Sequence, residues 1–352
     1  MAKSSAWLPP IMLLGLAAAG LATPAPDTKN TTAIHFLPGG VADADGGRGF
    51  VTNANGGVTA LDLETGKPLW ESETAGRPLA VADGRVWLQV RDKAKGHVFR
   101  VIGLNVDDGK PASESDPIVL PDWVAAVEGR GAGRSFTSSA YRDGGDLLVR
   151  WQANTWYWGG AAPSPQTEKA ARRHADGVAR VNLKSGKVEM LEADKAPPPP
   201  SSAAKVSAVD IEFTAAGKQK VVLKRWDPTT EKPLDPVVLA EGAPFQVVTI
   251  PSAGVTLVRD GTPLPGPPPN DYLWTVYALT TGKETAHFAA EANVAEFAII
   301  GPRAYYAVTG ASKGPPFGRV LPRTLKAVDL KTGKRLWELP LEGERLPPPP
   351  PP

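Results

Sequence analysis

The sequence has no cysteine among its 352 residues and only four histidines. Without cysteine the chain can form no disulfide and cannot carry a lipid on an N-terminal cysteine, so its stability depends on the packed core. The histidines are scattered, and none stands at the spacing to a second histidine or a carboxylate that metal ligands require. We therefore expect no metal-binding residues.

The chain also lacks an excess of either charge, because 39 basic and 37 acidic residues leave a net charge of +2. The two signs are interspersed, which argues against nucleic acid or an anionic membrane as the main partner. Glycine and proline contribute 36 and 37 residues. Their combined share lies below the roughly 25–30% that indicates disorder. With ten tryptophans, this composition is typical of short strands separated by many turns.

Long apolar runs are missing beyond the first 25 residues, because charges and prolines interrupt each of them. At the start, Lys3 precedes an apolar run from Ile11 to Ala22, and Ala-Thr-Pro-Ala follows at 22–25. This layout predicts a signal peptide over 1–25, since the run is shorter than the roughly 20 residues that span a bilayer. A retained N-terminal anchor is the alternative. After signal removal we expect no membrane span, and we expect export to the periplasm or the exterior.

What the sequence does contain is a repeated segment. A-L-D-L-E-T-G-K-P-L-W stands at 60–70 and A-V-D-L-K-T-G-K-R-L-W at 327–337. In the first copy, apolar residues on both faces predict a strand covered on both sides. Asp62 can accept hydrogen bonds from the following turn, and Gly66 can take the positive φ that closes it. Trp70 then lies on the returning strand, where only another layer could bury its large side chain.

Weaker copies occupy 101–110, 178–187, 222–232 and 276–283, and the copy at 222–232 has Glu231 at or near the glycine position. The turn glycines are Gly66, Gly109, Gly186, Gly282 and Gly333. One or two further strand-like runs precede each turn, and a period of about 40–50 residues with three or four strands is typical of a β-propeller blade. The sequence thus predicts an all-β fold, a propeller of about six four-stranded blades.

These segments resemble the repeat of the pyrroloquinoline-quinone (PQQ) type β-propellers, the quinoprotein dehydrogenase-like family. The resemblance implies a closed ring over 26–346, with the first and last copies as neighbouring blades and with Trp70 and Trp337 buried at blade junctions. The long interval between Gly109 and Gly186 holds either a seventh blade or an insertion, and 159–176 is typical of a polar loop between strands. The prolines at 347–352 are expected to form a polyproline tail.

Enzymes of this family bind PQQ with a calcium ion and a catalytic aspartate, and they commonly carry a disulfide of adjacent cysteines. This chain has no cysteine, and outside the repeat turn no stretch matches the family's cofactor-binding residues. We therefore expect no catalytic, cofactor-binding or metal-binding residues. The resemblance also reaches non-catalytic exported propellers, such as the scaffold subunit of the outer-membrane β-barrel assembly machinery. A monomeric, non-enzymatic scaffold that binds a protein or a glycan is the preferred function, and an atypical PQQ-dependent oxidoreductase, with PQQ and calcium, is the alternative.

The stretch R-W-Q-A-N-T-W-Y-W-G-G at 150–160 is rich in aromatic residues. Along a strand, two of its tryptophans would share one face with Gln152 and Asn154. Aromatic side chains beside amides can stack on sugars or hold a peptide, and they are enriched at binding hot spots. The alternative is that they fill the space between blades. The candidate partner-binding residues are Trp151, Trp156, Tyr157 and Trp158.

Overall fold

The computed structural model describes residues 34–43, 45–92, 94–124, 132–157, 173–199, 207–214, 218–227, 229–230, 232–242, 245–266, 270–292, 294–310 and 320–345. They all belong to one compact unit, Thr31–Pro352. The predicted signal peptide, the other unit Met1–Asn30 and the predicted proline tail lie outside the described residues.

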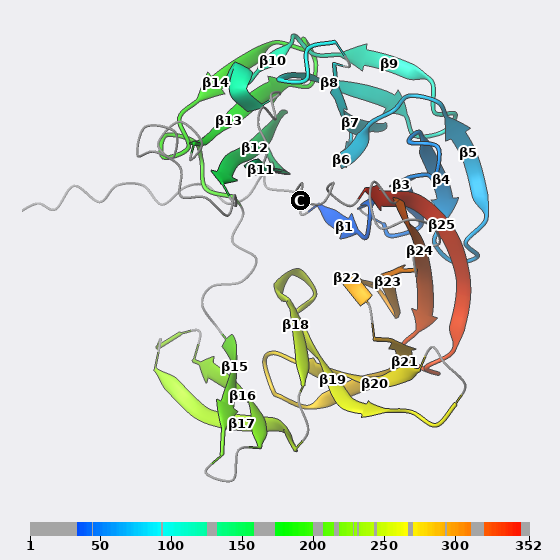
Figure 1. Cartoon of the computed structure of the whole chain (residues 1–352), viewed down its shortest axis with the longest axis vertical. Coiled ribbons are helices and arrows are strands. Elements are labelled where there is room, and N and C mark those ends of the chain that lie inside the picture. The colour runs from blue at the N-terminus through cyan, green and yellow to red at the C-terminus, as the bar shows by residue number, and fades with distance from the viewer. Residues whose placement is uncertain are drawn as a thin grey trace, which may run out of the picture. The chain divides into compact units, whose positions relative to one another are not determined.

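The described residues form six antiparallel sheets and two short 3-10 helices, so the expected all-β class is confirmed (Figure 1). Sheet 1 has the order β1 (His35–Leu37), β2 (Gly40–Ala42), β3 (Arg48–Thr52), β4 (Val58–Asp62), β5 (Pro68–Ser72). Sheet 2 contains β6 (Arg77–Ala82), β7 (Arg85–Arg91) and β8 (Val98–Asn105), and both β9 (Pro111–Glu114) and β10 (Ile118–Val119) pair with β8. The helix η2 (Asp122–Val124) follows.

Sheet 3 has the order β11 (Ala132–Asp143), β12 (Asp146–Tyr157), β13 (His174–Asn182), β14 (Val188–Leu191). Sheet 4 has the order β15 (Ser207–Phe213), β16 (Gln219–Trp226), β17 (Pro233–Gly242). Sheet 5 has the order β18 (Gln246–Ile250), β19 (Val255–Pro263), β20 (Asp271–Ala278), β21 (Glu284–Glu291), with η3 (Pro251–Ala253) between its first two strands. Sheet 6 has the order β22 (Val294–Ile300), β23 (Arg303–Thr309), β24 (Val320–Asp329), β25 (Arg335–Arg345). Three sheets have the expected four strands, two have five, and sheet 4 has three in the described part of the chain.

The repeated segments form the predicted hairpin turns. In the first turn the N–H of Gly66 donates to the carbonyl of Asp62 at 2.8 Å, and the Asp62 carboxylate accepts the backbone N–H groups of Glu64 and Thr65. All five turn glycines have positive φ, between 66° and 72°, which confirms the prediction for Gly66, Gly109, Gly186, Gly282 and Gly333. The weakest copy keeps the same hairpin, since the N–H of Asp227 donates to the carbonyl of Lys232 at 2.9 Å.

The long interval between Gly109 and Gly186 adds no further sheet in the described residues. It contains β10, η2 and the two longest strands, β11 and β12, of 12 residues each. Most of the predicted polar loop at 159–176 lies outside the described residues, but β13 begins at His174. The loop prediction is therefore wrong for its last three residues, which pair with β12.

Apolar clusters join neighbouring sheets in pairs. One cluster combines side chains of sheets 1 and 2, another those of sheets 2 and 3, and two more join sheets 4 to 5 and 5 to 6. A further cluster joins the last sheet to the first, with Leu61 and Leu63 of sheet 1 against Tyr305 and Leu325 of sheet 6. The predicted contact between the first and last copies is thus confirmed. Among the described residues, no cluster joins sheet 3 to sheet 4.

Candidate functional site

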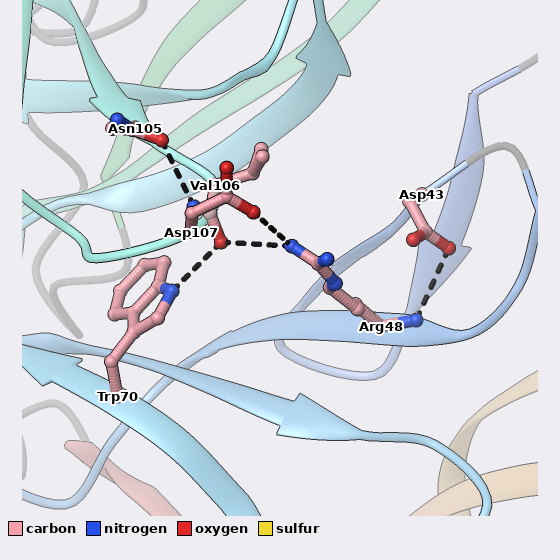
Figure 2. A network of polar contacts seen from close by, with 6 residues as sticks. All are labelled: Asp43, Arg48, Trp70, Asn105, Val106 and Asp107. Carbon is pink, nitrogen blue, oxygen red and sulfur yellow. Dashed lines mark hydrogen bonds and ion pairs between the residues drawn. The ribbon is translucent and has the colours of Figure 1, made fainter.

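Sheets 1 and 2 dock through an arginine and a tryptophan of sheet 1 that bind one turn of sheet 2 (Figure 2). The indole Nε1 of Trp70 donates to the carbonyl of Val106 at 2.8 Å. Arg48 Nη1 donates to the same carbonyl at 3.3 Å and lies 2.8 Å from a carboxylate oxygen of Asp107. A Cβ on Gly109 would lie 2.5 Å from the Trp70 ring, so a glycine is needed where the indole packs.

The same contacts join the last sheet to the first. Trp337 Nε1 donates to the carbonyl of Leu63 at 3.3 Å, and Arg303 Nη2 lies 3.4 Å from a carboxylate oxygen of Glu64. The Trp337 ring packs on Gly66, where an added Cβ would come within 2.4 Å. Sheet 6 therefore docks on sheet 1 as sheet 1 docks on sheet 2. We name this set of an arginine, a tryptophan and a turn glycine the docking set.

Trp70 and Trp337 lie at the junctions predicted for them, but they are half-buried, not buried. Each stands on the outermost strand of its sheet, so one side of the ring covers the neighbouring turn while the other faces solvent. The prediction that both indoles lie at junctions between neighbouring sheets and are not mainly exposed is confirmed.

Three other junctions use different contacts, and two of these contacts lie at the repeated turns. The N–H of Asp116 in sheet 2 donates to the carbonyl of Gly186 in sheet 3 at 2.8 Å. Between sheets 4 and 5, Arg225 Nη1 donates to the carbonyl of Thr280 at 3.1 Å. Between sheets 5 and 6, the buried Glu291 binds Lys326 and lies 3.3 Å from Arg335. Burial alone would raise the pKa of Glu291, but the hydrogen bond and charge of Lys326 and the charge of Arg335 lower it. The carboxylate thus stays ionised within an ion-pair network.

Sheet 3 has lost the docking set that would point toward sheet 4. In sheets 1 and 6 the docking arginine, Arg48 or Arg303, pairs with the first residue of the repeated turn. In sheet 3 the residue at that position is Asp146, which pairs with Asn182. Met190 follows the turn glycine at the tryptophan's position and is 46% exposed. The glycine of the next copy is replaced by Glu231, which lies outside the described residues.

A missing β-bulge explains why Met190 cannot dock on the next sheet. In sheets 1 and 6 a register shift precedes the tryptophan, which then pairs with Ala60 or Ala327 on the face toward the next sheet. Sheet 3 has no such shift between β13 and β14, so Met190 pairs with Ala179, whose side chain packs against sheet 2. Cross-strand partners share a face, and a bulge changes the face on which later residues lie.

The face of sheet 3 turned away from sheet 2 carries a small apolar cluster of Tyr141, Leu148 and Val178, which Ala196 helps to cover, and polar groups on either side of it. The Arg180 guanidinium lies 3.6 Å from carboxylate oxygens of Asp143 and Glu189 and 3.8 Å from Asp146. Farther along the strands is a cleft of about 370 Å³ lined by Thr137, Ser138, Ser139, Arg150, Trp151, Gln152, His174 and Asp176.

His174 is held in place within this cleft. Its Nδ1 is 2.7 Å from the side-chain oxygen of Asn154, and its Nε2 is 3.2 Å from a carboxylate oxygen of Asp176. The cleft therefore presents hydroxyl, amide, imidazole, carboxylate and guanidinium groups. Such a set can form hydrogen bonds to a peptide or a carbohydrate.

The four predicted partner-binding residues do not share one environment. Trp151 is 5% exposed and packs in the cluster between sheets 2 and 3, so it fits the packing interpretation. The backbones of Trp156 and Tyr157 end β12 and pair with Gly133 and Ala132. Trp158 lies outside the described residues. Partner binding by the last three residues stays a prediction.

Sequence reasoning missed Arg150 and His174 as members of the cleft. The amide side chains of Gln152 and Asn154 could have indicated these residues. The next strand, β13, pairs with β12 and places His174 directly opposite Asn154. The histidine stands twenty residues farther along the chain, so its spacing gave no indication of a site.

A second cavity, of about 960 Å³, is lined mainly by strands β1, β2, β6, β11 and β22 and includes Arg77, Glu296, Phe297 and Arg323. A PQQ-binding relative would hold its quinone through a calcium ion, which takes six to eight oxygen ligands. Here Glu296 is the only acid among the described lining residues, and it lies 3.2 Å from Arg323 and accepts the N–H of Gly39. Within the described part of the chain, no three histidine, cysteine or acidic side chains come together as metal ligands. These residues do not fit a quinone held through calcium.

In the part of the chain that the structure describes, no helix has the length and apolar character needed to cross a membrane.

Antiparallel sheets that repeat along the chain and dock through one recurring turn define a repeat protein of the β-propeller type. The model of the family described as outer membrane protein assembly factor BamB matches residues 19–197, just over half of the chain. The chain therefore belongs to this family of PQQ-type repeat proteins.

Several solved structures are similar at low identity. BamB from Moraxella catarrhalis is 14% identical, with 78% of this chain and 82% of that chain covered and a TM-score of 0.33. Dihydro-heme d1 dehydrogenase NirN in complex with DHE is 14% identical, with coverages of 88% and 67% and a TM-score of 0.32. Quinohemoprotein alcohol dehydrogenase from Comamonas testosteroni is 12% identical, with coverages of 90% and 68% and a TM-score of 0.31. At such TM-scores these likenesses say nothing about the activity of this chain. No curated protein matches it.

Proposed function

We propose that this chain is an exported, non-enzymatic propeller scaffold whose six sheets are the blades of a ring, and that it binds a partner protein through the open faces of sheets 3 and 4. The observation that carries this proposal is that, among the described residues, neither the docking set nor an apolar cluster joins sheet 3 to the sheet that follows it, whereas every other pair of neighbouring sheets shares an apolar cluster. Sheet 3 has Asp146 and Met190 where sheets 1 and 6 have an arginine and a tryptophan. A face that is not built for packing within a rigid scaffold is free to bind a partner.

The family description supports a protein as the partner, because an assembly factor acts through contacts with other proteins. The composition of the cleft on sheet 3 supports a glycan as a second candidate, since amide and hydroxyl groups line it and the aromatic segment 156–158 follows it in the chain. We place the mature chain in the periplasm or outside the cell, as a monomer.

Site-specific photo-crosslinking tests the partner face. A photoreactive phenylalanine analogue at Gln152 samples the cleft, and the same analogue at Val119, which is exposed on sheet 2, serves as the matched control. In cells that express the full chain, we expect a discrete crosslinked protein from position 152 and none from position 119. Equal crosslinking from both positions, or none from position 152, would contradict the proposed face.

Adding PQQ and calcium to the purified mature chain tests the enzyme alternative. The scaffold function predicts no bound quinone absorbance after gel filtration and no reduction of an electron-accepting dye with alcohols. Stoichiometric quinone with dye reduction would establish the oxidoreductase instead. A mass spectrum of the exported protein shows whether residues 1–25 are removed.

A further inference from the structure

In the described residues sheet 4 ends on β15 (Ser207–Phe213), an outer strand with exposed apolar side chains. It has three strands among the described residues, and β15 is its first (Figure 1). One edge of β15 pairs with β16, and no described strand pairs with the other edge. Natural edge strands are commonly protected by proline, by lysine or by a covering loop. The seven residues of β15, S-A-V-D-I-E-F, include neither proline nor lysine.

The two faces of β15 have opposite character. Val209, Ile211 and Phe213 alternate along one face, on which Ile211 is 42% and Phe213 70% exposed. Asp210 and Glu212 lie on the other face and share one lysine, Lys224, at 2.6 and 3.8 Å. A strand added to this edge would meet apolar side chains on one face and carboxylates on the other.

The described chain just before β15 is held elsewhere. The Tyr141 hydroxyl donates to the carbonyl of Pro197, and Ala196 is buried in an apolar cluster of sheet 3. Residues 197–200 are all proline. Proline has no N–H to donate to a strand ladder, so this segment is unsuited to cover the edge.

A second copy of the chain is also disfavoured. An antiparallel pairing of two β15 strands about Ile211 would place Asp210 of one copy opposite Glu212 of the other. Like charges directly opposite each other destabilise a strand pair, whereas opposite charges stabilise it. Lysine or arginine on the added strand would reverse that repulsion.

We propose that the edge of β15 with which no described strand pairs receives an extended segment of the partner protein, and that this segment alternates apolar with basic residues. Backbone hydrogen bonds would provide affinity, and the alternating side chains would provide specificity. This inference rests on the proposed scaffold function and names the kind of segment that the partner presents.

The experiment uses the full mature chain and a capped seven-residue peptide that alternates valine and lysine, labelled for fluorescence anisotropy. A peptide that alternates valine and glutamate is the counterpart. We expect the valine–lysine peptide to bind about tenfold more tightly, as cross-strand charge pairs predict. The double variant Asp210→Lys with Glu212→Lys should reverse this preference. The double variant Glu71→Lys with Glu73→Lys, on and beside the outer strand of sheet 1, should leave it unchanged.

Phe213→Asn tests the apolar face, and Val238→Asn is its matched control on β17, the opposite outer strand of the same sheet. We expect the first to weaken the peptide at least several-fold and the second to have no effect, with thermal unfolding showing both folded. Equal affinity for the two peptides, an unreversed preference in the Asp210/Glu212 variant, or a dimer in light scattering that excludes the peptide would overturn the proposal. Crosslinking through Gln152 would still stand in that case, so the two failures are distinguishable.

Discussion

The glycine of each repeated turn meets two requirements at once. Gly66 has a φ of 70°, and a Cβ there would lie 2.4 Å from the Trp337 ring. Gly84 has nearly the same φ, 69°, but nothing lies within 4 Å of its added Cβ. The pair therefore separates backbone strain from loss of the docking contact.

Gly84→Ala should lower the free energy of unfolding by about 1 kcal/mol, the strain of a left-handed residue. Gly66→Ala should lower it by about 2–4 kcal/mol, because the indole of Trp337 must also move. Urea unfolding of the two variants measures the difference. Equal losses would show that Trp337 does not pack on this turn in solution.

The turn aspartates contribute stability that depends on pH. Backbone hydrogen bonds from the turn lower the pKa of Asp62, Asp227 and Asp329 below the ordinary value of 3.8. Because the folded state holds these protons less tightly than the unfolded state, the contribution is complete above about pH 3.8 and is lost as the pH falls through the lower folded-state pKa. Asn105 and Asn182 accept the same kind of hydrogen bond in the second and third copies without titrating.

Replacing all three aspartates with asparagine should therefore keep the turns and flatten the loss of stability below pH 4. Urea midpoints from pH 7 to pH 2 measure this, and the wild-type chain is the reference. If the variant loses stability as steeply as wild type in that range, other carboxylates, such as buried Glu291, dominate acid unfolding.

The outer strands β5 and β25 dock their sheets on the next sheet, whereas β14 contacts no other sheet in that way in the part of the chain that the structure describes. Trp337→Ala should lower the free energy of unfolding by about 2–3 kcal/mol, below the range for a fully buried tryptophan because this ring is half-buried. Met190→Ala, the equivalent change in sheet 3, should lower it by less than about 0.5 kcal/mol. Thermal and urea unfolding compare the two. A large loss from Met190→Ala would mean that this side chain is covered after all.

The molecule as a whole should be least protected where sheets 3 and 4 follow each other. Local opening is easiest where few buried contacts hold an element. We expect the amides of β14 to exchange with deuterium at least several-fold faster than those of β5 and β25, which are outer strands of the same kind. Hydrogen exchange with mass spectrometry of the full chain checks this. Similar protection of the three strands would indicate that sheet 3 docks on sheet 4 as firmly as the other sheets dock.

Much of the repeat could be predicted from local sequence, because a hairpin turn is decided by groups only a few residues apart. Asp62, Thr65 and Gly66 form their hydrogen bonds with one another, so five turn glycines and the all-β class followed from the repeated segment alone. The sequence similarity between the first and last copies also indicated that the first and last sheets are neighbours in the fold. The sequence also predicted that their tryptophans lie between neighbouring sheets, but how much of each ring stays exposed depends on what covers it from another sheet.

The candidate site could be predicted only in part, for the same reason. Local sequence was enough to predict a strand with aromatic and amide side chains within 150–160, and β12 covers this stretch as far as Tyr157. The inward packing of Trp151, the contact of His174 with Asn154 and the position of Met190 on the face toward sheet 2 follow from the three-dimensional structure. A single bulge changes which face a residue takes, and a bulge is the result of pairing between strands. Local sequence determines the turns, whereas strand register and the contacts between sheets determine which surfaces remain open to a partner.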